Sequence, residues 1–489
     1  MGQTGVVPSP RWVDHVQNPA LYYGDCLDWM REWPDGAVDL IYLDPPFNSS
    51  ADYNIIFGSD SGTQAQVRGF ADTWKWDEAA AERTARFENA VAHPLHQVTL
   101  GFRSLLGPSG MLAYLTYMGE RLIEMRRLLA AHGSIYLHCD PTASHYLKAM
   151  MDAIFGHGSF RNEVIWSYRR WSVRTFRGFQ RMHDTILYYM KDPADAVFNV
   201  DYEPASESYL RRFKGGSNRK DPDNPTRVIP VDEPTRGMPR RDVWSDIGII
   251  AGNSRERVGY PTQKPLALLD RIISASSSPN DLVLDPFCGC GTAVVAAHNL
   301  GRRWVGIDIS ATAMDVIRRR LQPMGVEAPM FGIPQDMASA RRLAAERAYD
   351  FEAWAVSRIP GLAPNERKGA DHGIDGRGKL LEKPRDHASQ LVLAQVKGGR
   401  SFQLGQFRDF LHVVERENAA LGLYVTLDSV TSAQARAEAT SMGEMAFGAT
   451  RYPRVQLWSI EDFFDGRRPA LPALADPETG KPMQPSLLA

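Results

Sequence analysis

The stretch Val38-Asp39-Leu40-Ile41-Tyr42-Leu43-Asp44-Pro45-Pro46-Phe47 decides the fold, because a short apolar run ends here in a carboxylate, two prolines and an aromatic ring. The apolar, β-branched run predicts a buried strand of a parallel sheet. The prolines end the strand and restrict the residue before each of them to extended geometry. We therefore expect Asp44 to be held at the carboxyl end of the strand, where open α/β sheets bind their ligands.

This segment offers hydrogen-bond acceptors and few donors, because proline has no N–H. The acceptors are the Asp44 carboxylate and the Pro45 carbonyl, and Phe47 adds a flat ring beside them. Two acceptors next to an aromatic ring suit a planar guest that carries an exocyclic amine. On the tetrapeptide alone, a Pro-Pro turn that merely closes a strand remains the alternative.

Strand-like runs alternate with helical periodicity along most of the chain. Further strands are predicted at residues 133–140, 163–166, 184–190, 282–284 and 304–308, and helices at 111–131, 146–155, 265–276 and 292–300. This alternation predicts an α/β domain whose parallel sheet is covered by helices on both faces. Residues 48–77 lack such periodicity and are predicted to form a long loop beside the site.

A second motif, Leu282-Val283-Leu284-Asp285-Pro286-Phe287-Cys288-Gly289-Cys290-Gly291-Thr292, predicts a strand, a glycine turn and the start of a helix. Glycines allow close approach of the backbone to a ligand. The motif differs from the phosphate-binding glycine patterns, and Asp285 would repel a pyrophosphate, so a cationic or zwitterionic ligand fits better. Asp308 ends the next strand, at the position from which an acid accepts hydrogen bonds from a ribose diol.

Together, residues 44–47 and 285–292 resemble the amino-group DNA methyltransferases that use S-adenosylmethionine, with the catalytic motif first, as in the β-group order. Two further segments agree: Gly24-Asp25-Cys26 resembles the acid near the cofactor adenine, and residues 260–265 resemble the segment that closes over the methionine moiety. The resemblance covers about residues 20–320 and implies a Rossmann-like sheet. The implied cofactor-binding residues are Asp25, Thr262, Lys264, Asp285, Phe287, Gly289, Gly291, Thr292 and Asp308.

The resemblance also implies a base that is flipped out of double-stranded DNA into the pocket. Its catalytic residues would be Asp44, Pro45, Pro46 and Phe47: Phe47 stacks on the base, while Asp44 and the Pro45 carbonyl accept both amine hydrogens. The amine nitrogen then attacks the sulfonium methyl group, and catalysis is mostly positioning and electrostatics. Because Asp rather than Ser opens the tetrapeptide, adenine N6 is favoured over cytosine N4, which stays open.

A basic and aromatic stretch within residues 161–181 is predicted to contact DNA through phosphate contacts and stacking platforms. Its candidate DNA-binding residues are Arg169, Arg170, Arg174 and Arg177. A solvated arginine face over packed aromatics is the alternative. Residues 199–259, rich in Pro, Gly, Arg and Asp, form an insert that is our candidate for target recognition. A homodimer is left open.

Residues 321–338 are predicted as a linker, followed by a smaller α/β domain at 339–466 and a tail at 467–489. This domain resembles the Mrr-like branch of the PD-(D/E)XK, or restriction-endonuclease-like, fold, in which Gln replaces Glu. That match implies a nuclease site of Glu352, Asp375, Gln395 and Lys397, with Mg²⁺ on Asp375. A nuclease-like module kept for DNA binding or as a scaffold is the alternative, and a fused restriction–modification enzyme is the alternative function for the whole chain.

The composition of the 489-residue chain excludes several classes of protein. No apolar run is long enough to span a bilayer and the N-terminus lacks the apolar core of a signal peptide, so a cytoplasmic protein is expected. Four cysteines without a CxxC pair predict reduced thiols and neither a disulfide framework nor a zinc site. His138, His145 and His183 lack metal-ligand spacing and are interpreted as core or groove residues. The net charge of −2 does not decide whether nucleic acid is bound.

Overall fold

The computed structural model describes residues 16–46, 74, 76–169, 178–213, 216–220, 228–234, 237–251, 254–258, 262–334, 336–359, 361–364, 373–381, 390–399 and 401–475. Four predicted site residues lie outside these ranges: Phe47, Arg170, Arg174 and Arg177. Most of the predicted loop at 48–77 lies outside them too. We refer to the described residues up to 334 as the first unit and to those from 336 to 475 as the C-terminal unit.

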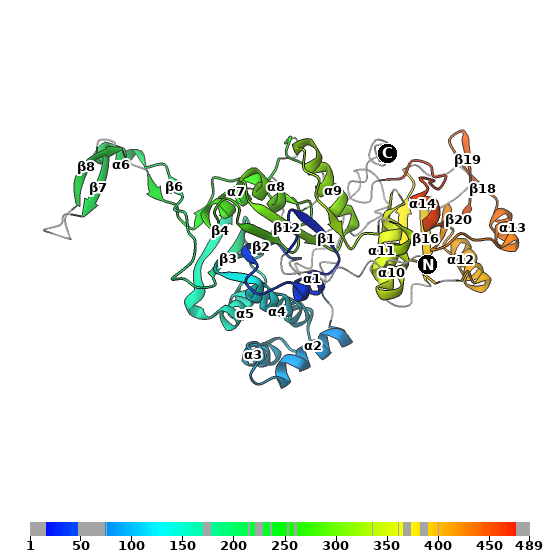
Figure 1. Cartoon of the computed structure of the whole chain (residues 1–489), viewed down its shortest axis with the longest axis horizontal. Helices are drawn as coiled ribbons and strands as arrows, with labels where there is room; N and C mark the ends of the chain where they lie inside the picture. Colours follow the sequence, from blue (N-terminus) through cyan, green and yellow to red (C-terminus); the bar gives the residue numbers. More distant parts are fainter. Residues whose placement is uncertain are drawn as a thin grey trace, which may run out of the picture.

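The first unit is built on a nine-stranded sheet with the strand order β10-β4-β5-β3-β2-β11-β12-β1-β13 (Figure 1). Its strands are β1 (Ala20–Tyr23), β2 (Val38–Leu43), β3 (Leu129–Cys139), β4 (Phe160–Ser167), β5 (His183–Met190), β10 (Val243–Trp244), β11 (Leu282–Asp285), β12 (Arg303–Asp308) and β13 (Met330–Phe331). The predicted strand that begins at Val38 is therefore confirmed, and it lies in the middle of the sheet.

Helices cover both faces of this sheet, as predicted. They are α1 (Cys26–Glu32), α4 (Gly110–Leu128), α5 (Ser144–Phe155), α7 (Leu266–Ala275), α8 (Thr292–Asn299) and α9 (Ala311–Leu321). Alternate residues of a strand point to opposite faces. Accordingly, Ile41 and Leu43 pack in the core with α1, α4 and α5, whereas Leu40 and Tyr42 pack in the core with α7, α8 and α9.

The prediction of an all-parallel sheet is wrong at β5, which pairs antiparallel with both β3 and β4. Parallel neighbours need a crossover, usually a helix, but β4 and β5 are joined directly by residues 168–182. A short return of this kind places β5 antiparallel to β4. The other described pairings among these strands are parallel.

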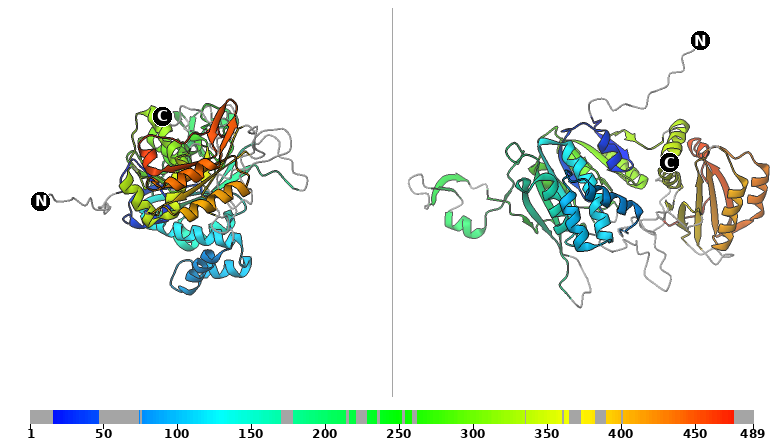
Figure 2. Two further views of the ribbon diagram at one scale, coloured as in Figure 1. Left: turned by 90° about the vertical axis from the view of Figure 1, so that its right-hand side faces the viewer. Right: turned by 90° about the horizontal axis from the view of Figure 1, so that it is seen from below.

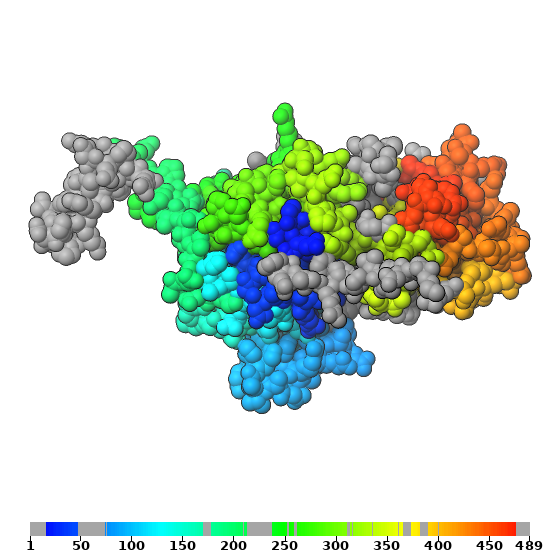
Figure 3. Space-filling model, viewed as in Figure 1, coloured from blue at the N-terminus to red at the C-terminus, as the bar shows by residue number. Residues whose placement is uncertain are grey.

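Two peripheral parts extend from this body. Helices α2 (Glu78–Asn89) and α3 (His96–Leu106) form a lobe beside α4, visible in blue in the space-filling view (Figure 3). The insert at 199–259 contains short elements that the sequence pattern did not predict: β6 (Tyr202–Glu203), α6 (Glu207–Phe213), β7 (Gly216–Lys220), β8 (Val228–Pro234) and β9 (Met238–Pro239). The β7–β8 hairpin and α6 project away from the sheet (Figure 1).

The C-terminal unit contains a second sheet with the order β14-β15-β16-β17-β20. Its strands are β14 (Leu362–Pro364), β15 (Gly376–Lys379), β16 (Leu391–Lys397), β17 (Leu421–Thr426) and β20 (Val455–Ser459). β15 runs antiparallel to β14 and β16, whereas β16, β17 and β20 run parallel to one another. Helices α10 (Met337–Glu346), α11 (Ala348–Ser357), α12 (Leu404–Arg416), α13 (Ala433–Ser441) and α14 (Ile460–Phe464), with the hairpin β18 (Glu444–Phe447) and β19 (Thr450–Pro453), complete it (Figure 2).

The two units share one continuous cluster of buried apolar side chains. Ile317 of α9 belongs to the same cluster as Leu343 of α10 and Phe351 of α11. Within the stretch predicted as a linker, β13 pairs with β1 at the edge of the first sheet. Leu474, in the predicted tail, is buried against the second unit and bridges Leu380.

Candidate active site

Four predicted acids meet at one edge of the first sheet. Asp44 follows β2, Asp285 ends β11, Asp308 ends β12, and Asp25 follows β1, and these four strands are consecutive neighbours. The strands run parallel, so their carboxyl ends lie at the same edge. The fold thereby assembles residues that are separated by up to about 280 positions in the sequence, as their positions at strand ends predicted.

The Asp44 carboxylate has one occupied and one unoccupied oxygen. Oδ2 forms an ion pair with the Lys264 ammonium, and the two side chains are only 15% and 12% exposed. Oδ1 is buried and has no hydrogen-bond partner among the described residues. Because a buried acceptor without a partner costs free energy, the site is arranged for an incoming hydrogen-bond donor at Oδ1.

The glycine turn after β11 is fixed by Asp308. Its Oδ2 accepts a hydrogen bond from the Gly289 N–H (2.7 Å) and its Oδ1 accepts one from Ser310 (2.8 Å). Gly291 has a φ of 75°, and a Cβ there would lie 2.7 Å from the Ile317 side chain, so only glycine fits. Arg320, which the sequence analysis did not single out, donates to the Cys290 carbonyl (2.7 Å) and to Thr292 Oγ1 (3.3 Å).

Two of these acids have displaced pKa values. Burial raises the pKa of Asp308 to about 6, although hydrogen bonds from Ser310 and Gly289 oppose this rise. Burial, together with the nearby Asp44 and Asp308 carboxylates, raises the pKa of Asp285 well above its usual range. Burial therefore favours the neutral forms of these two carboxyl groups, and a cationic ligand placed beside them would favour their ionised forms.

Asp25 is engaged on both oxygens by the protein itself. Oδ1 accepts a hydrogen bond from the Leu27 N–H (2.9 Å) and caps α1, while Oδ2 forms an ion pair with Arg121. The Arg121 side chain is 2% exposed and its guanidinium lies 3.3 Å from the centre of the Tyr117 ring. Asp25 therefore has a structural role, which the sequence motif did not reveal because Arg121 lies on α4.

The remaining predicted cofactor residues differ in exposure. Phe287 packs against the core cluster of α1 and α4, and its N–H donates to Asp285 Oδ1 (3.1 Å). Thr262 is exposed, whereas Lys264 points inward to Asp44. The sequence analysis did not predict this ion pair, which joins Lys264, a predicted cofactor residue, to Asp44, a predicted catalytic residue.

A chain of buried polar side chains also lies under the site. Tyr42 Oη lies 3.0 Å from His138 Nδ1, His138 Nε2 lies 3.1 Å from Asp184 Oδ2, and Tyr168 donates to Asp184 Oδ1 (2.9 Å). Burial raises the pKa of Asp184, but the bonds from His138 and Tyr168 and the charge of Lys264 outweigh it and bring that pKa to about 2. His138 is fully buried, which confirms its interpretation as a core residue.

The C-terminal unit contacts this edge at the turn after β1. A Cβ on Gly24 would lie 2.6 Å from Arg347 Nη2, so the guanidinium packs directly on the turn that carries Asp25. Tyr23 Oη donates to the Asp350 carbonyl (3.4 Å), and Arg347 forms an ion pair with Asp350. Neither residue carries a motif that the sequence analysis could have used.

The predicted nuclease residues lie on α11, before β15 and on β16. Asp375 Oδ2 accepts a hydrogen bond from the Val396 N–H (2.7 Å), which places it beside Gln395. Gln395 is 6% exposed, and its Oε1 is buried with no hydrogen-bond partner in the described part of the chain. Within the described ranges no three Asp, Glu, His or Cys side chains form a metal-binding group.

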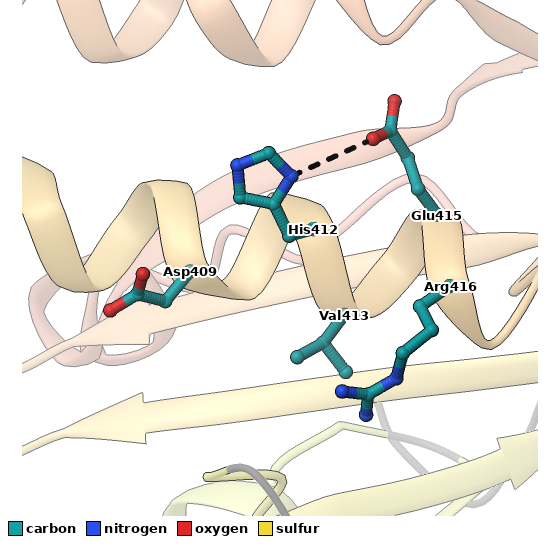
Figure 4. Close-up of a pocket in the computed structure, with 5 residues that line it drawn as sticks. All are labelled: Asp409, His412, Val413, Glu415 and Arg416. Carbon is teal, nitrogen blue, oxygen red and sulfur yellow. Dashed lines mark ion pairs between the residues drawn. The ribbon is translucent and has the colours of Figure 1, made fainter.

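A separate hollow lies on the surface of α12, lined by Asp409, His412, Val413, Glu415 and Arg416 (Figure 4). Its side chains all come from one helix, and the His412–Glu415 ion pair is long, at 3.9 Å. None of the residues predicted for chemistry lines it. We assign it no function.

Other expectations concern charge and thiols. Arg169 is exposed, as a DNA contact requires. Arg240, in the insert, forms ion pairs with Asp201 and Asp246 and so anchors the base of the insert.

All four cysteines are free and buried, which confirms the prediction of thiols. No helix in the described ranges is long and apolar enough to cross a membrane.

The fold brings four carboxylates to the carboxyl edge of an α/β sheet, which is the edge at which such sheets bind their ligands. The family described as DNA methylase matches residues 38–319. The chain belongs to this family of N6/N4 DNA methyltransferases, and it is an S-adenosylmethionine-dependent DNA methyltransferase of the adenine-N6 or cytosine-N4 type.

The chain is similar to two curated bacterial methyltransferases and to one solved methyltransferase structure. It is 26% identical over 307 residues to the DNA adenine methyltransferase YhdJ of Escherichia coli K12, covering 62% of this chain and 82% of the relative. It is 31% identical over 208 residues to the type II methyltransferase M.HpaI of Haemophilus parainfluenzae, covering 42% and 59%. The solved PvuII DNA methyltransferase, cytosine-N4-specific, aligns with a TM-score of 0.36 at 12% identity, covering 65% and 96%.

Proposed function

We propose that the chain methylates adenine N6 at a specific sequence in double-stranded DNA. The observation that carries this proposal is the buried Oδ1 of Asp44 after β2, which has no hydrogen-bond partner among the residues that the structure describes. The choice of adenine rests on Asp at the first position of the tetrapeptide, and cytosine N4 is the alternative.

The chain's own residues act mainly by positioning the amine. Asp44 Oδ1 and the Pro45 carbonyl accept the two amine hydrogens, so the nitrogen lone pair is less delocalised into the ring and is available for attack. Bound S-adenosylmethionine supplies an electrophilic methyl group on a sulfonium. The carboxylates of Asp285 and Asp308 stand where that cofactor's positive charge and ribose hydroxyls would be accommodated. Phe47 would stack on the flipped base.

Double-stranded DNA would be held by two parts of the first unit. Arg169 begins the basic and aromatic stretch after β4, at the same edge as Asp44. Helix α6 of the projecting insert carries Arg211 and Arg212, and the Arg211 side chain is 80% exposed. We infer that phosphate contacts come from the stretch and target recognition from the insert.

The test is modification-aware sequencing of DNA from cells that express the chain or its Asp44→Ala variant. We expect N6-methyladenine at one recurring motif, lost in the variant. N4-methylcytosine at a recurring motif would replace adenine by the alternative base. The absence of any new methylated base, in every sequence context, would overturn the proposal.

Cofactor affinity should depend on pH through Asp308, whose pKa is raised to about 6 by burial. The ribose hydroxyls donate best to the ionised carboxylate, which is lost as the pH falls through 6. We expect the affinity for S-adenosylmethionine, measured by calorimetry, to be constant above about pH 7 and to fall by about tenfold per pH unit below pH 6. Asp308→Asn should bind more weakly and lose this dependence; an unchanged profile would contradict the role.

A second candidate function is Mg²⁺-dependent DNA cleavage by the C-terminal unit. Two observations favour it: the buried Oε1 of Gln395 has no hydrogen-bond partner within the described ranges, and the Asp375 carboxylate is fixed beside it by the Val396 N–H. These oxygens would hold the ion, which would polarise a phosphodiester, with Lys397 beside the attacked phosphate and Glu352 as a supporting acid.

Cleavage should appear as nicking of plasmid DNA by the full chain with Mg²⁺, with methylated and unmethylated substrates compared. We expect Asp375→Ala and Lys397→Ala to abolish nicking while methyl transfer persists. If the wild type nicks neither substrate, the unit serves as a DNA-binding or scaffold module. Nicking that survives both substitutions would indicate a contaminating nuclease.

A further inference from the structure

The contact between Lys264 and Asp44 joins two segments that lie 220 residues apart. The sequence pattern around Lys264 predicts contact with the cofactor, yet its ammonium is paired with the carboxylate predicted to receive the target amine. Both side chains are largely buried, at 12% and 15% exposure. A buried pair of this kind constrains geometry more than an exposed one, since neither charge can turn freely into water.

The backbone around Lys264 is fixed on both sides. The side-chain amide of Gln263 accepts a hydrogen bond from the Val258 N–H at Oε1 (2.9 Å) and donates one from Nε2 to the Glu256 carbonyl (2.7 Å). Glu256 Oε1 accepts a hydrogen bond (2.6 Å) from the N–H of Leu266, the first residue of α7. Lys264 therefore lies between two fixed points, the hydrogen-bonded Gln263 side chain and the first residue of α7, and from there it reaches Asp44.

From this geometry we propose that Lys264 is a positioning residue for Asp44: it holds Oδ2 and so presents Oδ1 alone to the target amine. The proposal rests on the proposed function, because it concerns the same amine. The charges around the pair are Asp285 on β11 and Asp184 on β5, and the positive charge of Lys264 acts on both. The positive charge of Lys264 thus offsets the repulsion between Asp44 and these neighbouring carboxyl groups.

A cofactor ligand and a positioning residue predict different kinetics, so Lys264→Met and Lys264→Arg distinguish them. We expect Lys264→Met to lower kcat by about 10²-fold, as small misplacements in an active site do. The Kd for S-adenosylmethionine, measured by calorimetry without DNA, should change less than about threefold. Lys264→Arg should recover part of kcat, because the guanidinium can also pair with Oδ2.

The matched control is Lys148→Met, which removes a half-buried lysine that pairs with Asp152 on α5. It should leave kcat and cofactor affinity unchanged. A parallel rise of the cofactor Kd in Lys264→Met, with normal kcat at saturating cofactor, would overturn the proposal and make Lys264 a cofactor ligand.

Thermal melting keeps the inference testable even if the chain methylates no DNA. Lys264→Met and Asp44→Asn should each lower Tm, and the double variant should melt above Lys264→Met, because it no longer leaves a buried carboxylate unpaired. Additive losses would show that the two residues do not act as a pair. Failure of the wild type to methylate would instead count against the proposed function alone.

Discussion

Replacing Asp44 with alanine should reduce methyl transfer by about 10³-fold, because the variant loses the buried acceptor that orients the amine and responds to its developing charge. The reaction is best followed as single-turnover incorporation of label from S-adenosylmethionine into DNA. Multiple turnovers would mix the chemical step with product release.

The same variant should still bind cofactor, since Asp285 and Asp308 remain in place at the neighbouring strand ends. Asp44→Asn is the informative companion: its amide keeps one acceptor oxygen but loses the negative charge that pairs with the Lys264 ammonium. We expect its rate to lie between those of wild type and Asp44→Ala. Turnover near the wild-type rate in Asp44→Ala would remove Asp44 from the reaction.

Asp25→Ala should lower the free energy of unfolding by about 3 kcal/mol, because it leaves the buried Arg121 guanidinium without its carboxylate. The α1 cap at Leu27 is lost at the same time. Denaturant titration of the full chain measures this change. Cofactor affinity should fall as well, since the turn after β1 loses its anchor.

A paired substitution separates the two effects. Asp25→Ala with Arg121→Met removes both charges and should recover part of the stability that Asp25→Ala loses. A loss of cofactor affinity that persists in this stabilised double variant would assign Asp25 a direct contact with the cofactor. A surface-like loss below about 0.5 kcal/mol in Asp25→Ala would refute the structural role.

The residues at strand ends could be predicted from the sequence because their signals are local. The apolar run at 38–43 predicts a buried strand, the prolines after Asp44 predict its end, and the glycines after Asp285 predict a turn. Alternation of strands and helices then places those ends on one edge. The family resemblance added the order of the motifs, and the family match over residues 38–319 supports the family itself.

The remaining features depend on contacts between distant segments, which leave no local pattern. The antiparallel β5 follows from a direct return after β4, and β13 joins β1 within a stretch whose composition looks like a linker. Lys264 meets Asp44, and Arg121 meets Asp25, only after the sheet and α4 are in place. Such contacts between residues far apart in the chain leave no local pattern from which a single sequence could predict them.

The continuous apolar cluster from α9 through α10 and α11 bears on how such a chain can evolve. A recombination event that exchanged the C-terminal unit for an unrelated one would expose the side chains that now meet Leu343 and Phe351. It would also remove Arg347 from the turn at Gly24. Gene fusion joined by a flexible spacer leaves both partners interchangeable, whereas this arrangement does not. The two units are therefore expected to be inherited together, and changes in one to be matched by changes in the other.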